Sequence, residues 1–162
     1  MILTPHFLTG AAIINKTNPF LGIILSFLSH YLLDAIPHSE YSIKNIKNRK
    51  WKKSFFDFLK IFFDLFLGIL IIFIITKKIF LSFIGGFFAI FPDILTFFYI
   101  LFPQNKILKY HYNFHKKIHF FNKEEQNSIK FKNMNFSEKI YFLFKIFSQI
   151  VVFLIAVILL KL

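Results

Sequence analysis

Three ionisable residues stand in apolar stretches, where their types and spacing could do chemistry. His30 and Asp34 are four residues apart in SHYLLD, and Asp93 follows Pro92 in another apolar stretch. On a helix, residues four apart point the same way, about 6 Å from each other. Imidazole and carboxylate groups are ligands of divalent metals, and buried polar groups need partners. The 30/34 pair therefore predicts either two metal ligands or one hydrogen-bonded His–Asp pair.

A second set is a row of histidines at every fourth residue. His111, His115 and His119 lie in a segment rich in lysine. On a helix this row forms one face, and Lys116 and Lys117 point away from that face. The row predicts either metal ligation or a solvated helix that faces lipid headgroups.

For three more candidate residues the sequence allows a simpler role as well as metal binding or catalysis. His6 follows Pro5 in the first turn of an expected helix, where an ordinary interfacial histidine is the alternative. Asp93 could end a helix as a hydrated carboxylate. His38, just past Pro37, is the weakest ligand candidate, but it could carry a proton.

The elements that must position these residues are apolar helices. The chain has 162 residues, 56% of them hydrophobic, with 27 Phe and no Cys. Stretches of about 18 or more apolar residues can cross a bilayer, and the absence of Cys excludes disulfides and thiolate-bound metals. We predict one all-α, multi-pass membrane domain over residues 1–162, with five apolar helices and one amphipathic helix at 105–120. The apolar helices are expected at 5–15, 20–36, 55–76, 79–102 and 138–161.

Positive charge is concentrated between the apolar stretches. The net charge is +12, and most Lys and Arg fall in segments 38–54 and 103–137. The positive-inside rule places both segments on the cytoplasmic face of a cell membrane. Such segments favour anionic lipid headgroups over nucleic acid as the partner. The same face would gather most of the ionisable candidates: His6, His30, Asp34, His38, Asp93, His111, His115 and His119.

Other residues predict how the helices pack. Asp57, Lys60 and Asp64 share one helix face and are interpreted as an intramembrane ion pair. Gly85 and Gly86 could let two helices approach closely. Pro92 predicts a break or kink in its helix.

Four motifs together resemble a known family. TPHFLTGAA, SHYLLDAIPH, GGFFAIFPD and FHKKIH are similar to motifs of membrane-bound metal-dependent hydrolases, of which the LexA-binding inner-membrane-associated type is an example. Zinc-dependent phospholipase C is a more distant likeness. The order of the motifs differs, because in that group the PD motif and the His pair precede SH-x-x-x-D. The resemblance implies six metal ligands: His6, His30, Asp34, Asp93, His115 and His119.

The resemblance and the residue pattern predict the same first function. A divalent ion, most simply zinc, would activate water at the cytoplasmic headgroup interface, and an amphiphilic phosphoester is the expected substrate. His38 and His111 are reserve residues for acid–base catalysis. The alternative is a non-enzymatic membrane protein whose His/Asp set is a structural metal clip or a buried polar network. A transporter ranks last, because its ligands should lie near the bilayer midplane.

Overall fold

The computed structural model describes residues 2–119 and 135–162. Within these ranges the chain is helical and contains no strand, as the sequence predicts. The elements are α1 (Leu3–Lys16), α2 (Pro19–Ala35), α3 (Lys44–Lys47), the 3-10 helix η1 (Trp51–Lys53), α4 (Phe55–Ile75), α5 (Ile79–Leu101), α6 (Lys106–Ile118) and α7 (Phe136–Lys161). Part of the basic segment 103–137 and the expected last residue of the amphipathic helix, Phe120, lie outside the described residues.

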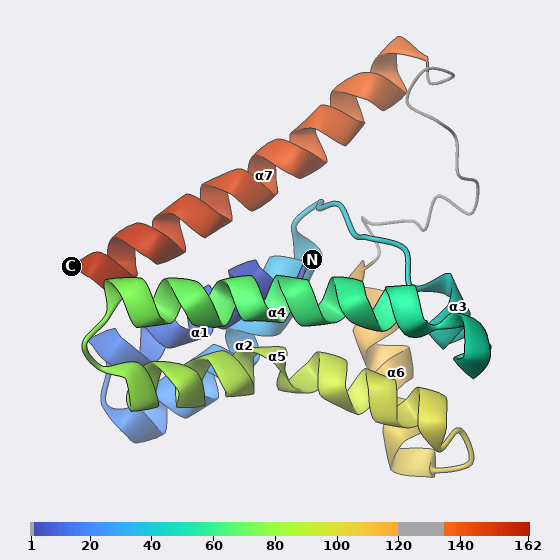
Figure 1. Cartoon of the computed structure of the whole chain (residues 1–162), viewed down its shortest axis with the longest axis horizontal. Coiled ribbons are helices and arrows are strands. Elements are labelled where there is room, and N and C mark those ends of the chain that lie inside the picture. Colours follow the sequence, from blue (N-terminus) through green and yellow to red (C-terminus); the bar gives the residue numbers. More distant parts are fainter. Residues whose placement is uncertain (1, 120–134) are drawn as a thin grey trace.

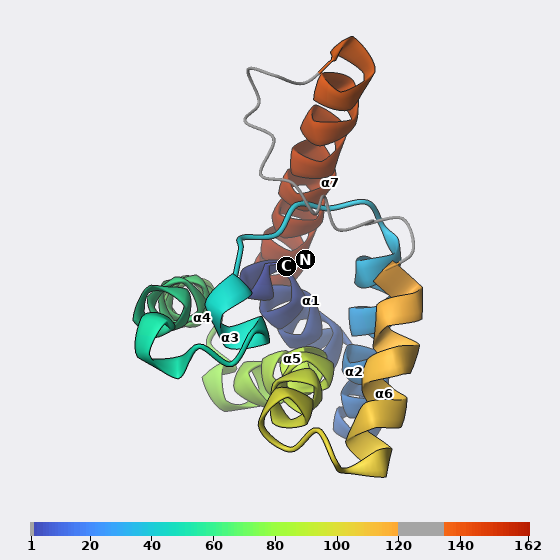
Figure 2. The same cartoon turned by 90° about the vertical axis from the view of Figure 1, so that its right-hand side faces the viewer.

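Helix α1 is the centre of the bundle. It contacts α2, α4, α5 and α7, and Figure 2 shows it with these helices around it. Its Phe7, Leu8 and Ala11 are buried, together with Ile72 of α4 and Ala156 of α7. The first turn of α1, which carries His6, is therefore enclosed by protein.

Glycines allow the tight packing of α1 against α5. A Cβ atom added to Gly10 would lie 2.3 Å from the carbonyl oxygen of Gly85, and one added to Gly86 would lie 2.7 Å from the ring of Phe7. Real Cβ contacts are not this short, so the two backbones require glycine at these positions. The predicted role of Gly85 and Gly86 in close helix approach is confirmed.

Three helices among the described residues are long and apolar enough to cross a membrane: α4, α5 and α7. All five predicted apolar helices form, but α1, for which the sequence leaves a span open, and α2, for which it predicts one, are too short to count among those of spanning length. Helices α1 and α2 have 14 and 17 residues. At 1.5 Å per residue they reach about 21 and 26 Å, against a hydrocarbon core of about 30 Å.

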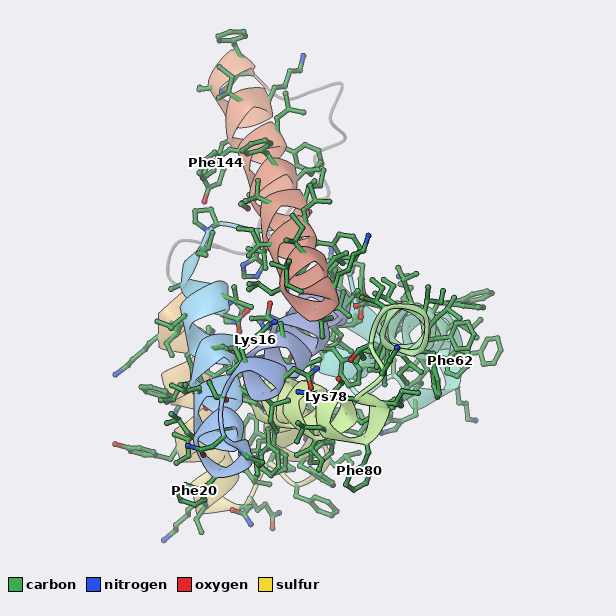
Figure 3. All side chains as sticks on the ribbon, turned by 90° about the vertical axis from the view of Figure 1, so that its left-hand side faces the viewer. Lys16, Phe20, Phe62, Lys78, Phe80 and Phe144 are labelled. Carbon is green, nitrogen blue, oxygen red and sulfur yellow. The ribbon has the colours of Figure 1, made fainter. Side chains whose placement is uncertain are left out.

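Aromatic side chains cover the outside of the bundle. Phe62, Phe80 and Phe144 project away from their helices in Figure 3, and each is more than half exposed. A surface of this composition is typical of a protein surrounded by lipid, because contiguous apolar surface is costly in water. It agrees with the three helices of spanning length in favouring a membrane protein.

Both ends of the bundle carry lysines, but more of them lie at the end formed by α3 and α6. Helices α3 and α6 lie at one end of the long axis in Figure 1, while Lys16 and Lys78 lie at the opposite end, which faces the viewer in Figure 3. From Lys78 to Asp93, α5 rises about 22 Å. Asp93 therefore lies well towards the end of the bundle that carries α3 and α6.

Three local details of the helices differ from what the sequence predicts. Of the break or kink expected at Pro92, the break is wrong because α5 continues through this residue, and the kink stays a prediction. Thr4, directly before Pro5, is a residue type typical of N-caps, but α1 begins before it and has Ile2 as its N-cap. Ser137, the N-cap that the sequence suggests for the last helix, lies inside α7, whose N-cap is Asn135 in a capping box with Glu138.

The expected ion pair on α4 is half right. Lys60 does approach Asp57, with 3.5 Å between Nζ and Oδ1. The Asp57 carboxylate also accepts backbone N–H groups at the start of α3. Asp64 accepts hydrogen bonds from Thr4 and Tyr41, so its partners among the described residues are neutral donors.

Candidate metal centre

The carboxylate of Asp34 is the point on which the histidines converge. The Nε2 atoms of His115, His30 and His119 lie 2.8, 2.9 and 3.1 Å from its Oδ2. Nε2 of His6 lies 3.2 Å from its Oδ1. Four imidazoles thus surround one carboxylate, which is itself only 1% exposed.

Three helices bring these groups together. His6 comes from the first turns of α1, whereas His30 and Asp34 lie on one face at the end of α2. His115 comes from the last turn of α6, and His119 directly follows that helix. Because α1 lies against α2, and α6 against α2 and α5, residues up to 113 positions apart in the chain share one site.

The Nδ1 atoms of His30 and His115, which point away from Asp34, lie within hydrogen-bonding distance of groups on α5. Nδ1 of His30 lies 2.7 Å from the carbonyl oxygen of Ala89, to which it must donate. Nδ1 of His115 lies 3.0 Å from Oγ1 of Thr96. A neutral imidazole that donates through Nδ1 has its lone pair on Nε2. The Nε2 lone pair of His30 is then directed at the common centre, and so is that of His115 in the tautomer that donates to the Thr96 hydroxyl, which is the usual arrangement of metal-binding histidines and their outer-shell partners.

The separations of the nitrogens suit a bound cation. Nε2 of His115 lies 3.0 Å from Nε2 of His30 and 3.2 Å from Nε2 of His119. Two lone pairs at such distances repel each other unless a proton or a metal ion lies between them. Ligands of a tetrahedral ion with bonds of about 2.0–2.1 Å are about 3.3 Å apart, which is close to these values.

His6 supplies a second indication. Both of its ring nitrogens are buried and have no hydrogen bond of acceptable geometry among the described residues. A buried, unsatisfied imidazole is costly, and burial, followed by the nearby His30, lowers its pKa to about 4. His6 is therefore neutral at pH 7, the form that binds a metal, and the residues present fit a divalent ion.

Asp93 and His38 extend the cluster on two sides. Oδ1 of Asp93 lies 3.8 Å from Nε2 of His30, and His30, Asp93 and His115 offer ligand atoms that lie within 4.8 Å of one another. Nε2 of His38 lies 3.9 Å from Oδ1 of Asp34. Together with His119, His38 and Asp34 form another group that could hold an ion.

His38 also has acceptors on both sides of its ring. Its Nδ1 donates to the carbonyl oxygen of Ile36 at 2.7 Å, and its Nε2 lies 3.0 Å from Oε1 of Glu40. Burial acts to raise the pKa of Glu40, but the hydrogen bond with His38 and nearby positive charge hold it below its usual range. The ionised Glu40 carboxylate beside Nε2 holds the His38 ring in place, which suits the predicted proton carrier.

Helix α7 fixes the segment that carries His38. Ser148 donates to the carbonyl oxygen of Pro37, and Gln149 donates to that of Ser39. These bonds hold the backbone on either side of His38, so a residue in a connecting segment has a defined position.

His111 lies outside the cluster. Its Nε2 accepts from the hydroxyl of Tyr31 at 3.1 Å, and it belongs to none of the groups that could hold an ion. Burial, followed by the charge of His115, lowers the pKa of His111, so it is neutral at pH 7. As a reserve catalytic residue it could act through Tyr31, whose ring contacts those of His30 and His115.

Sequence reasoning missed two members of the site. Glu40 follows His38 by two residues in the basic segment, and this acidic residue so close to a candidate histidine could have indicated that it belongs to the site. Thr96 follows Asp93 by three residues, and its partner on α6 becomes visible once the helices are packed. Glu40 and Asp93 are 43% and 33% exposed in their side chains, so they mark the open side of an otherwise buried cluster.

No protein-family model, curated protein or solved structure matches this chain. The family resemblance of its motifs therefore stays a prediction.

Proposed function

We propose that this chain is a membrane-embedded, divalent-metal-dependent hydrolase. The observation that carries the proposal is the convergence of four imidazole Nε2 atoms on the Asp34 carboxylate. The outward nitrogens of His30 and His115 are occupied by Ala89 and Thr96, so their inward lone pairs are free for ligation. A set of neutral imidazoles and carboxylates without thiolates is typical of zinc and related ions.

The two oxygens of Asp34 face different ligands, which suits one ion or a bridged pair. Oδ2 is shared by His30, His115 and His119, while Oδ1 faces His6 and, at a longer distance, His38. A bound divalent ion supplies Lewis acidity and lowers the pKa of a coordinated water. The protein's part is to hold that ion in a site with a buried side and a partly exposed side.

A buried residue, His38, and its partly exposed neighbour Glu40 lie where they could assist proton transfer. His38 lies between Asp34 and Glu40, and Oε1 of Glu40 is also 3.7 Å from Nδ1 of His119. Because Nδ1 of His38 donates to the Ile36 carbonyl, Nε2 is the nitrogen that could accept a proton from the reacting water, while the Glu40 carboxylate holds the ring in place. We therefore assign His38 as a general acid–base residue and Glu40 as the group that orients it.

An amphiphilic phosphoester is the proposed substrate class. Asp93 lies about 22 Å from the Lys78 end of the bundle, beyond the midplane of a hydrocarbon core of about 30 Å. The centre thus lies nearer the membrane face of α3 and α6, whose lysines attract anionic headgroups. By the positive-inside rule this face is cytoplasmic.

The test begins with metal content. Protein purified in detergent without chelators and then supplied with zinc or manganese is analysed by mass spectrometry, beside His30→Ala, Asp93→Ala and the control His111→Gln. We expect near-stoichiometric metal in the wild type and the control, and loss in the other two. Phosphoesterase assays on lipid substrates follow. A wild type that takes up no metal would refute the proposal.

A structural metal clip is the second candidate, and burial favours it. His6, His30, Asp34 and His38 are each at most 1% exposed, as is usual for a closed structural site. Stoichiometric metal without turnover of any phosphoester, and with no coordinated water by spectroscopy of a cobalt-substituted protein, would favour the clip. An open coordination position would favour the enzyme.

A further inference from the structure

We propose that Asp64 of α4 is a positioning residue that fixes the metal ligand His6 from across the bundle. The inference rests on the proposed metal centre, but not on hydrolysis. Asp64 is ten residues into α4, on a helix that contributes none of the groups that could hold an ion. Its carboxylate is directed at the start of α1.

Asp64 of α4 caps the N-terminus of α1, a role that an N-cap side chain next to α1 in the sequence usually has. Oδ2 accepts from the backbone N–H of Leu3 at 2.5 Å, and Oδ1 accepts from the backbone N–H of Thr4 at 3.1 Å. The hydroxyl of Thr4 lies 2.5 Å from Oδ1 and 2.6 Å from the backbone oxygen of Asp64. The N-cap residue Ile2 offers no side-chain bond, so α4 satisfies N–H groups that α1 leaves open.

This cap acts on His6 because the His6 ring has no well-formed hydrogen bond among the described residues: its Nε2 lies 3.2 Å from Oδ1 of Asp34 without making one. His6 follows Thr4 by two residues, within the turn that Asp64 fixes. Its ring nitrogens have no hydrogen bond among the described residues, and its ring stacks on that of His30 with 4.3 Å between centroids. The place of the His6 ring is therefore set by the backbone of α1, and that backbone is held by Asp64.

The Asp64 carboxylate also contacts the segment that follows α2. The hydroxyl of Tyr41 donates to Oδ2 of Asp64 at 3.2 Å, and Tyr41 directly follows Glu40. One side chain thus connects the α1 turn that bears His6 with the segment that bears His38 and Glu40. Both of these segments face Oδ1 of Asp34, so Asp64 supports that half of the centre.

A purely structural cap would stabilise the protein without altering metal affinity, and α4 offers a matched control. Asp57 is buried and, like the partly buried Asp64, accepts two backbone N–H groups, those of Asn45 and Ile46, at 2.9 and 3.3 Å. Those N–H groups belong to the start of α3, which carries no residue of the metal cluster. Asp57→Asn therefore makes the same chemical change away from the centre.

The experiment measures zinc affinity by chelator competition on the full chain in detergent, for wild type, Asp64→Asn, Thr4→Val and Asp57→Asn. An asparagine at 64 places an amide NH₂ against a backbone N–H, and loss of supporting bonds around a ligand costs about 10–100-fold in metal affinity. We expect a loss of that size for Asp64→Asn, a smaller loss for Thr4→Val, and a change within about threefold for Asp57→Asn. Hydrogen exchange over residues 3–8 should rise in Asp64→Asn but not in Asp57→Asn.

Equal zinc affinity of Asp64→Asn and wild type would overturn the inference while the proposed function stood. Equal losses in Asp64→Asn and Asp57→Asn would also overturn it, because the effect would then be general destabilisation. A wild type that binds zinc but hydrolyses no phosphoester would refute the hydrolase and leave the positioning role intact. A wild type that binds no zinc would overturn both.

Discussion

Replacing Asp34 by Asn should separate a metal centre from a hydrogen-bonded polar network. The change is isosteric, so packing in the core is kept while the carboxylate is lost. Both oxygens of Asp34 face imidazole nitrogens, and four histidines lie within 3.2 Å of them. Loss of a supporting residue costs about 10–100-fold in metal affinity, so loss of this shared ligand should cost at least about 100-fold.

The magnitude follows from linkage between binding and unfolding. With free zinc at about 100 times the wild-type Kd, binding adds about 2.7 kcal/mol to the free energy of unfolding. An affinity at least about 100-fold weaker leaves at most about 0.4 kcal/mol of that stabilisation. The melting temperature of the wild type should therefore rise clearly when zinc is added, and that of Asp34→Asn should hardly change.

The assay is thermal unfolding in detergent with and without zinc, beside Asp57→Asn, which removes a buried carboxylate away from the centre. The control should keep the zinc-dependent rise whatever its own stability. If Asp34→Asn is stabilised by zinc as much as wild type, the cluster does not hold the ion. If zinc stabilises none of the three proteins, the buried network is the better account.

Three further predictions test the supports of the site. Thr96→Val should weaken zinc affinity about 10–100-fold, measured by chelator competition, because His115 loses the hydroxyl group beside its Nδ1. An unchanged affinity would show that Thr96 does not orient His115. Zinc affinity should fall as the pH drops towards about 4, the pKa of the buried His6, because a proton then competes with the metal for this imidazole; an affinity that stays constant from pH 7.5 to below 4 would exclude ligation by His6. Gly10→Val should cost about 1–3 kcal/mol in unfolding experiments, because even its Cβ would lie 2.3 Å from the carbonyl oxygen of Gly85, and an unchanged melting temperature would show that α1 and α5 can separate freely.

The helices and much of the cluster were predictable from local pattern. Apolar stretches, Pro37 after α2 and the spacing of His30 and Asp34 depend on neighbours in the chain, and these signals gave the all-helical class and one face of the site. The lengths of α1 and α2 fall short of a span because Lys16–Pro19 and Pro37 end them, so fewer of the five apolar helices are of spanning length than the sequence suggests.

Tertiary packing decided the rest, because it joins residues that the sequence keeps far apart. The carboxylate of Asp64 looks like half of an ion pair when α4 is considered alone, yet it caps α1 once the two helices pack. Likewise, the pairing of Thr96 with His115 and of Ala89 with His30 depends on how α5 lies against α6 and α2. The sequence determined which groups could bind a metal ion. Which nitrogen each histidine turns inward depends on contacts between helices. The spacing of residues along the chain carries no information about those contacts.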